Sequence, residues 1–231
     1  MKKLIVALFL FLIAGITANA QKAKKTVSKP KTKVVKSQTT VNKVELEMLI
    51  KHDDGSTTFE KLKTGDKLVY EVNAGGSTYN FIVSLNKANV KDGYDFNYEM
   101  TNENKTKGHV KFSFQTLWDS KQYVNYFKGG ELTLKDAITV WLSGSNFADM
   151  PSKKTDMTLD NNPVETFYRP ENDVYEPTIL FKGKQVKIDG FFINNAEDGK
   201  GDKTICIQNS SSNTLILKMD LGWTIELKEI K

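Results

Sequence analysis

The chain has 231 residues, a formal net charge of +5 and one cysteine, at position 206. One cysteine excludes an internal disulfide framework, and two isolated histidines exclude an ordinary zinc site built from His and Cys clusters. The positive charge is unevenly placed. Ten of the 33 basic residues lie in residues 1–43, which contain no acidic residue, so residues 44–231 carry 23 basic and 28 acidic side chains.

Residues 1–20 have the pattern of a secretory signal peptide. Lys2 and Lys3 precede an apolar run over residues 4–16, and Ala18 and Ala20 form a small-x-small cleavage site, so Gln21 is the expected first mature residue. The run is shorter than the ~20 residues that span a bilayer, and no second one follows, so we expect no transmembrane segment. The sequence predicts an exported protein, either periplasmic or secreted.

Residues 21–43 form a lysine-rich segment with one proline and no aromatic residue. This composition predicts a disordered basic arm that stays solvated. It suits contact with an anionic surface such as lipopolysaccharide or phospholipid headgroups, and it equally suits a solubilising spacer. Without aromatic residues among the lysines, it offers no stacking platform, and we do not expect a nucleic-acid partner.

Residues 44–231 are expected to form a single β-rich domain. Apolar and polar residues alternate along many short segments, which is typical of strands with one face covered. Gly75-Gly76 and Asp198-Gly199 are expected hairpin turns. We therefore predict a mainly β fold: an antiparallel curved sheet, a sandwich or a (half-)barrel. The expected strands lie near residues 44–50, 57–62, 68–72, 79–85, 94–100, 110–114, 164–168, 178–182, 185–193, 204–208, 215–219 and 223–227.

One short amphipathic helix is predicted over about residues 133–143. Thr133 and Asp136 resemble a capping box, and Gly144 is placed to end the helix. The helix is expected to cover part of the sheet, with Trp141 as its main anchor. Its apolar residues follow helical spacing: Leu134, Ala137, Ile138, Trp141 and Leu142.

Tyrosines gather on the apolar face of the first well-marked strands, at Tyr70, Tyr79, Tyr94 and Tyr98. A buried tyrosine hydroxyl usually needs a hydrogen-bond partner, so this face is not expected to be wholly dry. The hydroxyls either reach solvent at the rim of the sheet or line a partly polar cavity for an apolar small molecule. With Trp141, these tyrosines are the candidate ligand-binding residues.

No nucleotide-binding or serine-hydrolase motif is present. Residues 194–202 fail the calcium-loop pattern because Ala196 and Ile205 stand where oxygen ligands belong.

Cys206 alternates with two isoleucines and is expected to be a small structural residue. No cofactor or metal is predicted. The carboxylates of three segments could face one another across strands as a hydrolytic pair: Glu45 and Glu47, Asp95 and Glu99, and Glu71.

Five segments carry a resemblance to exported proteins of Gram-negative bacteria of the domain-of-unknown-function type. They are NAQ at 19–21, GDKLVYEVNAGG at 65–76, YEMTNENKTKG at 98–108, TVWLS at 139–143 and TLILKMDLGWTIELKEI at 214–230. The resemblance implies a β domain in the envelope with a short helix midway, and it supplies no active-site residue.

The function that these observations favour is a non-enzymatic envelope protein that binds an apolar small molecule or another envelope protein. One alternative is a hydrolase of glycan or ester substrates that uses carboxylates without a recognisable motif. Another is a purely structural or interaction protein. A tyrosine-lined cavity without ionisable groups would favour binding, whereas two facing carboxylates, one with a raised pKa, would favour hydrolysis.

Overall fold

The computed structural model describes residues 46–125 and 127–231, all of which belong to one compact unit that covers residues 41–231. The predicted signal peptide, its cleavage site at Ala18, Ala20 and Gln21, and the lysine-rich arm at 21–43 lie outside the described residues. Within the described part of the chain, no helix has both the length and the apolar character needed to cross a membrane.

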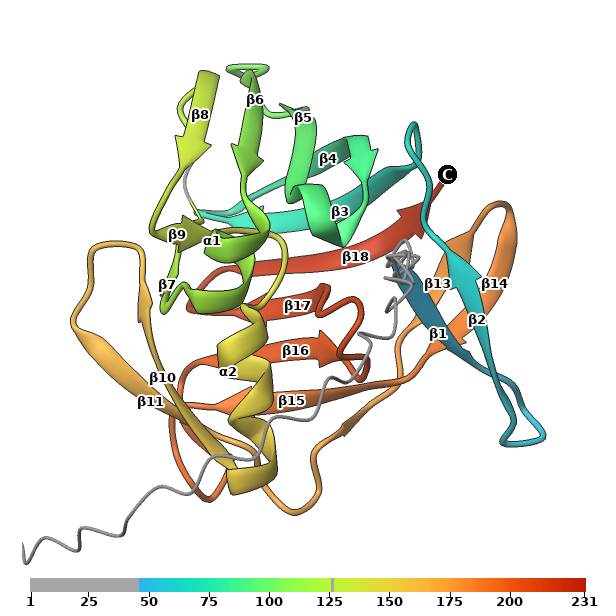
Figure 1. Ribbon diagram of the computed structural model, residues 1–231, viewed down its shortest axis with the longest axis vertical. Helices are drawn as coiled ribbons and strands as arrows, with labels where there is room; N and C mark the ends of the chain where they lie inside the picture. The colour runs from blue at the N-terminus through green and yellow to red at the C-terminus, as the bar shows by residue number, and fades with distance from the viewer. Residues whose placement is uncertain (1–45, 126) are drawn as a thin grey trace, which may run out of the picture. The chain divides into compact units, whose positions relative to one another are not determined.

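The fold is mainly β, as predicted, and its strands join into one 18-stranded sheet (Figure 1). The strands are β1 (Glu47–Lys51), β2 (Thr57–Lys61), β3 (Lys67–Ala74), β4 (Ser77–Ala88), β5 (Tyr94–Met100), β6 (Lys107–Phe112), β7 (Gln122–Tyr123), β8 (Gly130–Leu134), β9 (Ala137–Ile138), β10 (Lys154–Leu159), β11 (Val164–Tyr168), β12 (Val174–Tyr175), β13 (Thr178–Phe181), β14 (Lys184–Ile188), β15 (Gly190–Asn194), β16 (Thr204–Gln208), β17 (Ile216–Asp220) and β18 (Thr224–Ile230).

The sheet curves into a nearly closed, barrel-like wall. One continuous run of paired strands is β8-β6-β5-β4-β3-β18-β17-β16-β15, in which only the β6–β8 pair is parallel. The far end of β18 also pairs with β13, which leads through β14 to β1 and β2. The β10–β11 hairpin connects to β15 and, through β10, to the short strands β7 and β9.

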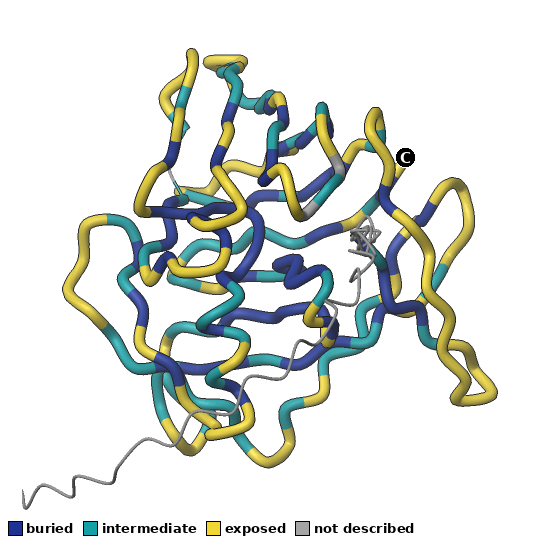
Figure 2. The backbone as a smooth tube through the Cα atoms, viewed as in Figure 1, coloured by how far each residue is buried: buried dark blue, intermediate teal, exposed yellow. Residues whose placement is uncertain are grey.

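Alternation along the strands places one set of side chains inside the curve and the other set in solvent. On β3, Leu68, Tyr70 and Val72 are buried, whereas Lys67 and Asn73 are exposed. Buried backbone follows the central strands and exposed backbone follows the hairpin tips (Figure 2). The hairpins at Gly75-Gly76 and around Asp198-Gly199 are confirmed, because each turn joins two paired antiparallel strands.

The predicted helix over residues 133–143 is wrong. Residues 130–134 form β8, which pairs in parallel with β6, and residues 137–138 form β9. In the following segment, Trp141 forms an isolated antiparallel bridge to Leu215, as a strand residue does. The apolar residues that follow helical spacing in this segment are buried for a different reason, because they contact partners on several strands. These residues are Leu134, Ala137, Ile138, Trp141 and Leu142.

The helices of the described residues lie on either side of this region. Helix α1 (Phe114–Asp119) begins after Ser113, whose hydroxyl accepts a hydrogen bond from the Thr116 backbone N–H. Helix α2 (Gly144–Ala148) begins after Ser143, which caps the Asn146 N–H in the same way. Gly144, expected to end a helix, therefore begins one. Short 3₁₀ turns occupy η1 (Val90–Asp92) and η2 (Met150–Ser152).

Candidate functional site

A cavity of about 50 Å³ lies against the inner face of β3, β4 and β18. Its floor consists of two neighbouring rows of side chains that the strand register aligns. In the first row, Ile225, Val72 and Tyr79 are cross-strand partners. In the second row, Tyr70 is opposite Phe81 on the adjacent strand. Because side chains alternate between faces, both rows point to the same side of the sheet.

The deep wall facing this floor comes from the short strands β7 and β9 and the segment after β9. Tyr123, Thr139 and Val140 are all buried there. The Tyr123 hydroxyl accepts a hydrogen bond from the Val140 backbone N–H at 2.9 Å, and the Thr139 side chain bonds to it as well. The Tyr70 hydroxyl donates to the Ile216 carbonyl at 2.9 Å. The deep hydroxyls are therefore already paired, and the remaining wall is apolar.

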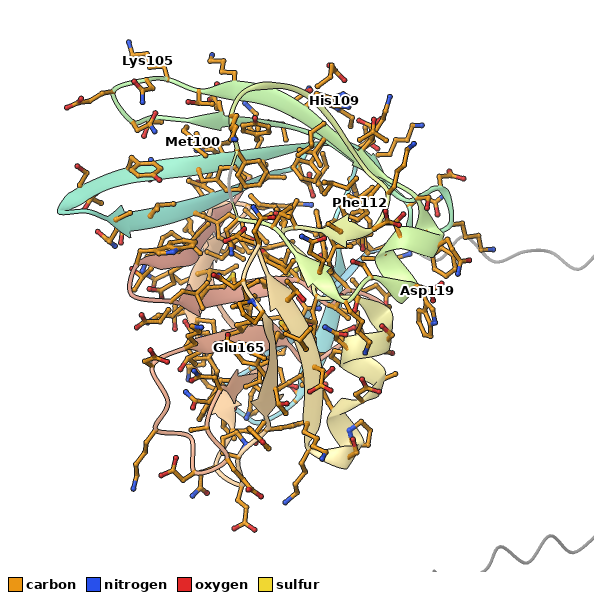
Figure 3. The ribbon with its side chains drawn as sticks, turned by 90° about the vertical axis from the view of Figure 1, so that its left-hand side faces the viewer. Met100, Lys105, His109, Phe112, Asp119 and Glu165 are labelled. Atoms are coloured by element: carbon orange, nitrogen blue, oxygen red, sulfur yellow. The ribbon has the colours of Figure 1, made fainter. Side chains whose placement is uncertain are left out.

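Half-buried residues form the rim of the cavity, and most of them are large and apolar. They are Tyr79, Met100, Asn125, Phe127, Trp223 and Ile225. Figure 3 labels Met100 at the end of β5 and shows how densely side chains fill the interior beside it. Asn125 is the one amide, and Asp160 holds it in place by accepting a hydrogen bond from the Asn125 backbone N–H at 2.6 Å.

The cavity lining contains no Asp, Glu, Lys, Arg or His. Burial raises the pKa of the Tyr70 and Tyr123 hydroxyls far above neutral, so both stay uncharged. An uncharged apolar wall provides nothing that would compensate the desolvation of an ion. This lining therefore favours an uncharged, apolar group over an ion.

The structure brings two of the five predicted ligand-binding residues to the cavity. Tyr70 lies in its floor, and Tyr79 lies where the floor reaches the rim. Tyr94 instead packs on Trp141, with ring centroids 4.1 Å apart, and Trp141 is fully buried. Tyr98 packs against Phe127 of the rim, but its hydroxyl is taken by the Gly129 backbone N–H at 2.9 Å.

Sequence reasoning missed the opposite wall. Tyr123 lies in a two-residue strand, which is too short to show any alternation. Thr139 and Val140 were assigned to the predicted helix, so their place in a cavity wall was hidden. The alternation of Trp223 with Ile225 was visible, but the pairing of β18 with β3 that brings both residues to the tyrosines is a long-range contact.

A second group of polar side chains occupies the outer face of β5, β6 and β8. His109 places its Nε2 2.6 Å from Asp95 Oδ1 and its Nδ1 2.6 Å from Glu131 Oε2. Figure 3 shows His109 near the outer edge of the molecule. Hydrogen bonds to Glu131 and then to Asp95 raise the pKa of His109. This group ties three strands together, and the described residues show no nucleophile bonded to the imidazole.

Of the carboxylates that were considered as hydrolytic pairs, Asp95 and Glu99 each bond to a basic side chain. Burial acts to raise the pKa of Asp95, but hydrogen bonds from His109 and Asn86 outweigh it, and the pKa lies below its usual value. Glu99 forms an ion pair with Lys107 at 3.1 Å. Glu71 is opposite Glu226 on β18. Glu45 lies outside the described residues.

Cys206 is buried on β16, and burial raises the pKa of its thiol to about 12. A thiol with such a pKa is a poor nucleophile, which agrees with the structural role expected for it. Within residues 46–125 and 127–231, no three or more His, Cys, Asp and Glu side chains are arranged to hold a metal ion.

Comparisons of this chain with protein-family models, with curated proteins and with solved structures found no match.

Proposed function

We propose that this chain is a non-enzymatic binding protein of the bacterial envelope that takes an uncharged, apolar group into the cavity between β3, β4, β18 and the segment after β9. The observation that carries the proposal is the lining of the cavity. Aromatic and aliphatic side chains surround it, no charged side chain reaches it, and its deep hydroxyls already have partners. Binding sites for apolar small molecules have this composition.

The size of the cavity defines what part of a ligand it holds. One water-sized group needs roughly 10–15 Å³ of such volume. About 50 Å³ therefore accommodates the apolar end of a small molecule, with the rest of the molecule at the rim. An apolar side chain of another envelope protein would meet the same wall.

Hydrolysis has less support. A glycosidase needs a carboxylic acid with a raised pKa near a second carboxylate. Among the described residues, four carboxyl groups have a clearly shifted pKa, and in each of them the pKa is lowered. They belong to Asp53, Asp54, Asp95 and Asp149. None of these residues lines the aromatic cavity.

A fluorescence titration tests the proposal. N-phenyl-1-naphthylamine is a neutral apolar probe whose emission rises when it leaves water, and it should bind the purified protein with saturation. Trp223 is half-buried at the rim, so its emission should change in the same titration. The protein is expected to bind the probe at one site.

A matched pair of variants locates that site. Ile225→Trp places a larger ring at the rim of the cavity and should abolish saturable binding of the probe. Lys228→Trp adds the same ring at an exposed position of the same strand and should leave binding unchanged. Equal binding by both variants would place the probe elsewhere, and no saturable binding by the unmodified protein would refute the proposal.

A further inference from the structure

Val140 has a backbone conformation that a β-branched residue rarely adopts. Its φ is +68°, in the left-handed region. The other non-glycine residues with positive φ in the described chain are Lys105, Lys153, Asp160 and Lys182, none of which is β-branched. For a β-branched side chain, this conformation is strained, and it persists only where the surroundings hold it.

Two hydrogen bonds hold Val140 in this conformation. Its N–H donates to the Tyr123 hydroxyl at 2.9 Å, and its carbonyl accepts from the Ile216 N–H at 2.9 Å. Tyr123 and Ile216 both line the cavity, as Val140 does. The strained residue is therefore built into the cavity wall through its own backbone.

The path of the chain requires a bend here but does not require valine. Ile138 pairs with Tyr123 on β7, whereas Val140 begins the segment that pairs with residues 214–216. A glycine would make this change of partner without strain. The isopropyl group is buried, so its contribution must come from filling space inside the protein.

We propose that Val140 sets the size limit of the cavity and so determines which ligands bind. This inference rests on the proposed binding function. With valine in the wall, the cavity holds about four water-sized groups, so it should bind the slim end of an unbranched alkyl chain more tightly than a fused ring system. Without the isopropyl group, the same wall would admit a broader apolar group.

Two substitutions distinguish the effect of side-chain size at position 140 from the effect of backbone strain there. Val140→Ala removes two methyl groups but keeps a Cβ in the left-handed conformation, whereas Val140→Gly removes the whole side chain and the strain. Each variant is titrated with 1-octanol, as the alkyl probe, and with N-phenyl-1-naphthylamine, as the ring probe. Both variants should shift the ratio of the two dissociation constants toward the ring probe by about tenfold or more, the effect of a few methyl groups in an apolar pocket.

Thermal unfolding supplies a readout that does not depend on any ligand. Val140→Gly should unfold at a higher temperature than Val140→Ala because glycine adopts positive φ without strain. An unchanged ratio of dissociation constants in both variants would overturn the role of Val140 while leaving the binding function intact. A lower unfolding temperature for the glycine variant than for the alanine variant would overturn the strain argument. Failure of the unmodified protein to bind either probe would instead refute the proposed function.

Discussion

The Trp141 indole donates a hydrogen bond from Nε1 to the side-chain Oδ1 of Asn213 at 2.9 Å, and both residues are buried. Asn213 in turn donates from Nδ2 to the backbone carbonyl of Glu47, at the start of β1. The indole ring also packs against Tyr94 of β5. Trp141 therefore connects three parts of the chain that are far apart in sequence.

Trp141→Ala should lower the free energy of unfolding by about 3–5 kcal/mol, because it opens a cavity and leaves a buried amide oxygen without its donor. Urea denaturation measures this loss. Trp141→Phe keeps part of the packing but loses the hydrogen bond, so its cost should be smaller. Lys135→Ala, at an exposed position between β8 and β9, should change stability by less than ~0.5 kcal/mol. A neutral Trp141→Ala would contradict the central place of this residue.

Residues 133–143 show what local patterning can and cannot predict. The spacing of Leu134, Ile138 and Trp141 correctly indicated burial, since all three are buried. It gave the wrong conformation because β8 forms through a parallel pairing with β6, and Trp141 bridges to Leu215. Such long-range pairings leave no period in the local sequence, and strands as short as β9 have no period to show.

The same distinction applies to the cavity. Tyr70 and Tyr79 were predictable because β3 and β4 are long and alternate clearly. Tyr123 faces them from a short strand, and Val140 from a residue with positive φ that no propensity for valine would suggest. The sequence thus predicted the tyrosine-bearing floor of the cavity, and the wall opposite it depends on tertiary contacts.

Cys206 should not react with thiol reagents while the protein is folded. The thiol is buried, and a pKa of about 12 leaves almost no thiolate at neutral pH. Incubation with iodoacetamide followed by mass spectrometry should show no label in the native protein and complete labelling in urea. Rapid labelling of the native protein would show that β16 opens to solvent.

Protein purified from its native envelope should begin at Gln21, because Ala18 and Ala20 form the expected cleavage site. The intact mass measures this directly. A mass that corresponds to all 231 residues would contradict export by this signal, and a mass that corresponds to a start well inside residues 21–43 would show that the lysine-rich arm is removed as well.

His109 should make stability depend on pH in the range above the ordinary histidine pKa of about 6.5. Both of its ring nitrogens lie 2.6 Å from carboxylate oxygens, which only accept hydrogen bonds, so the arrangement needs the doubly protonated, charged ring. Hydrogen bonds to Glu131 and Asp95 raise the folded-state pKa of His109. A raised folded-state pKa stabilises the protein fully below the unfolded pKa, and this stabilisation is lost as pH rises through the folded-state pKa.

The unfolding free energy of the unmodified protein should therefore exceed that of His109→Gln by the largest margin below the unfolded-state pKa of about 6.5. The margin should shrink as the pH rises through the folded-state pKa. Urea denaturation at several pH values measures this margin, and NMR titration of the His109 ring locates its pKa.

His52→Gln is the matched control, because the His52 ring bonds to the uncharged Thr58 hydroxyl and its loss should leave the pH dependence in place. Below about pH 3.9 the lowered pKa of Asp95 acts in the opposite direction, and its contribution should disappear as that carboxylate is protonated. A margin that stays constant from pH 6 to pH 9 would mean that the pKa of the imidazole between Asp95 and Glu131 is the same in the folded and unfolded states.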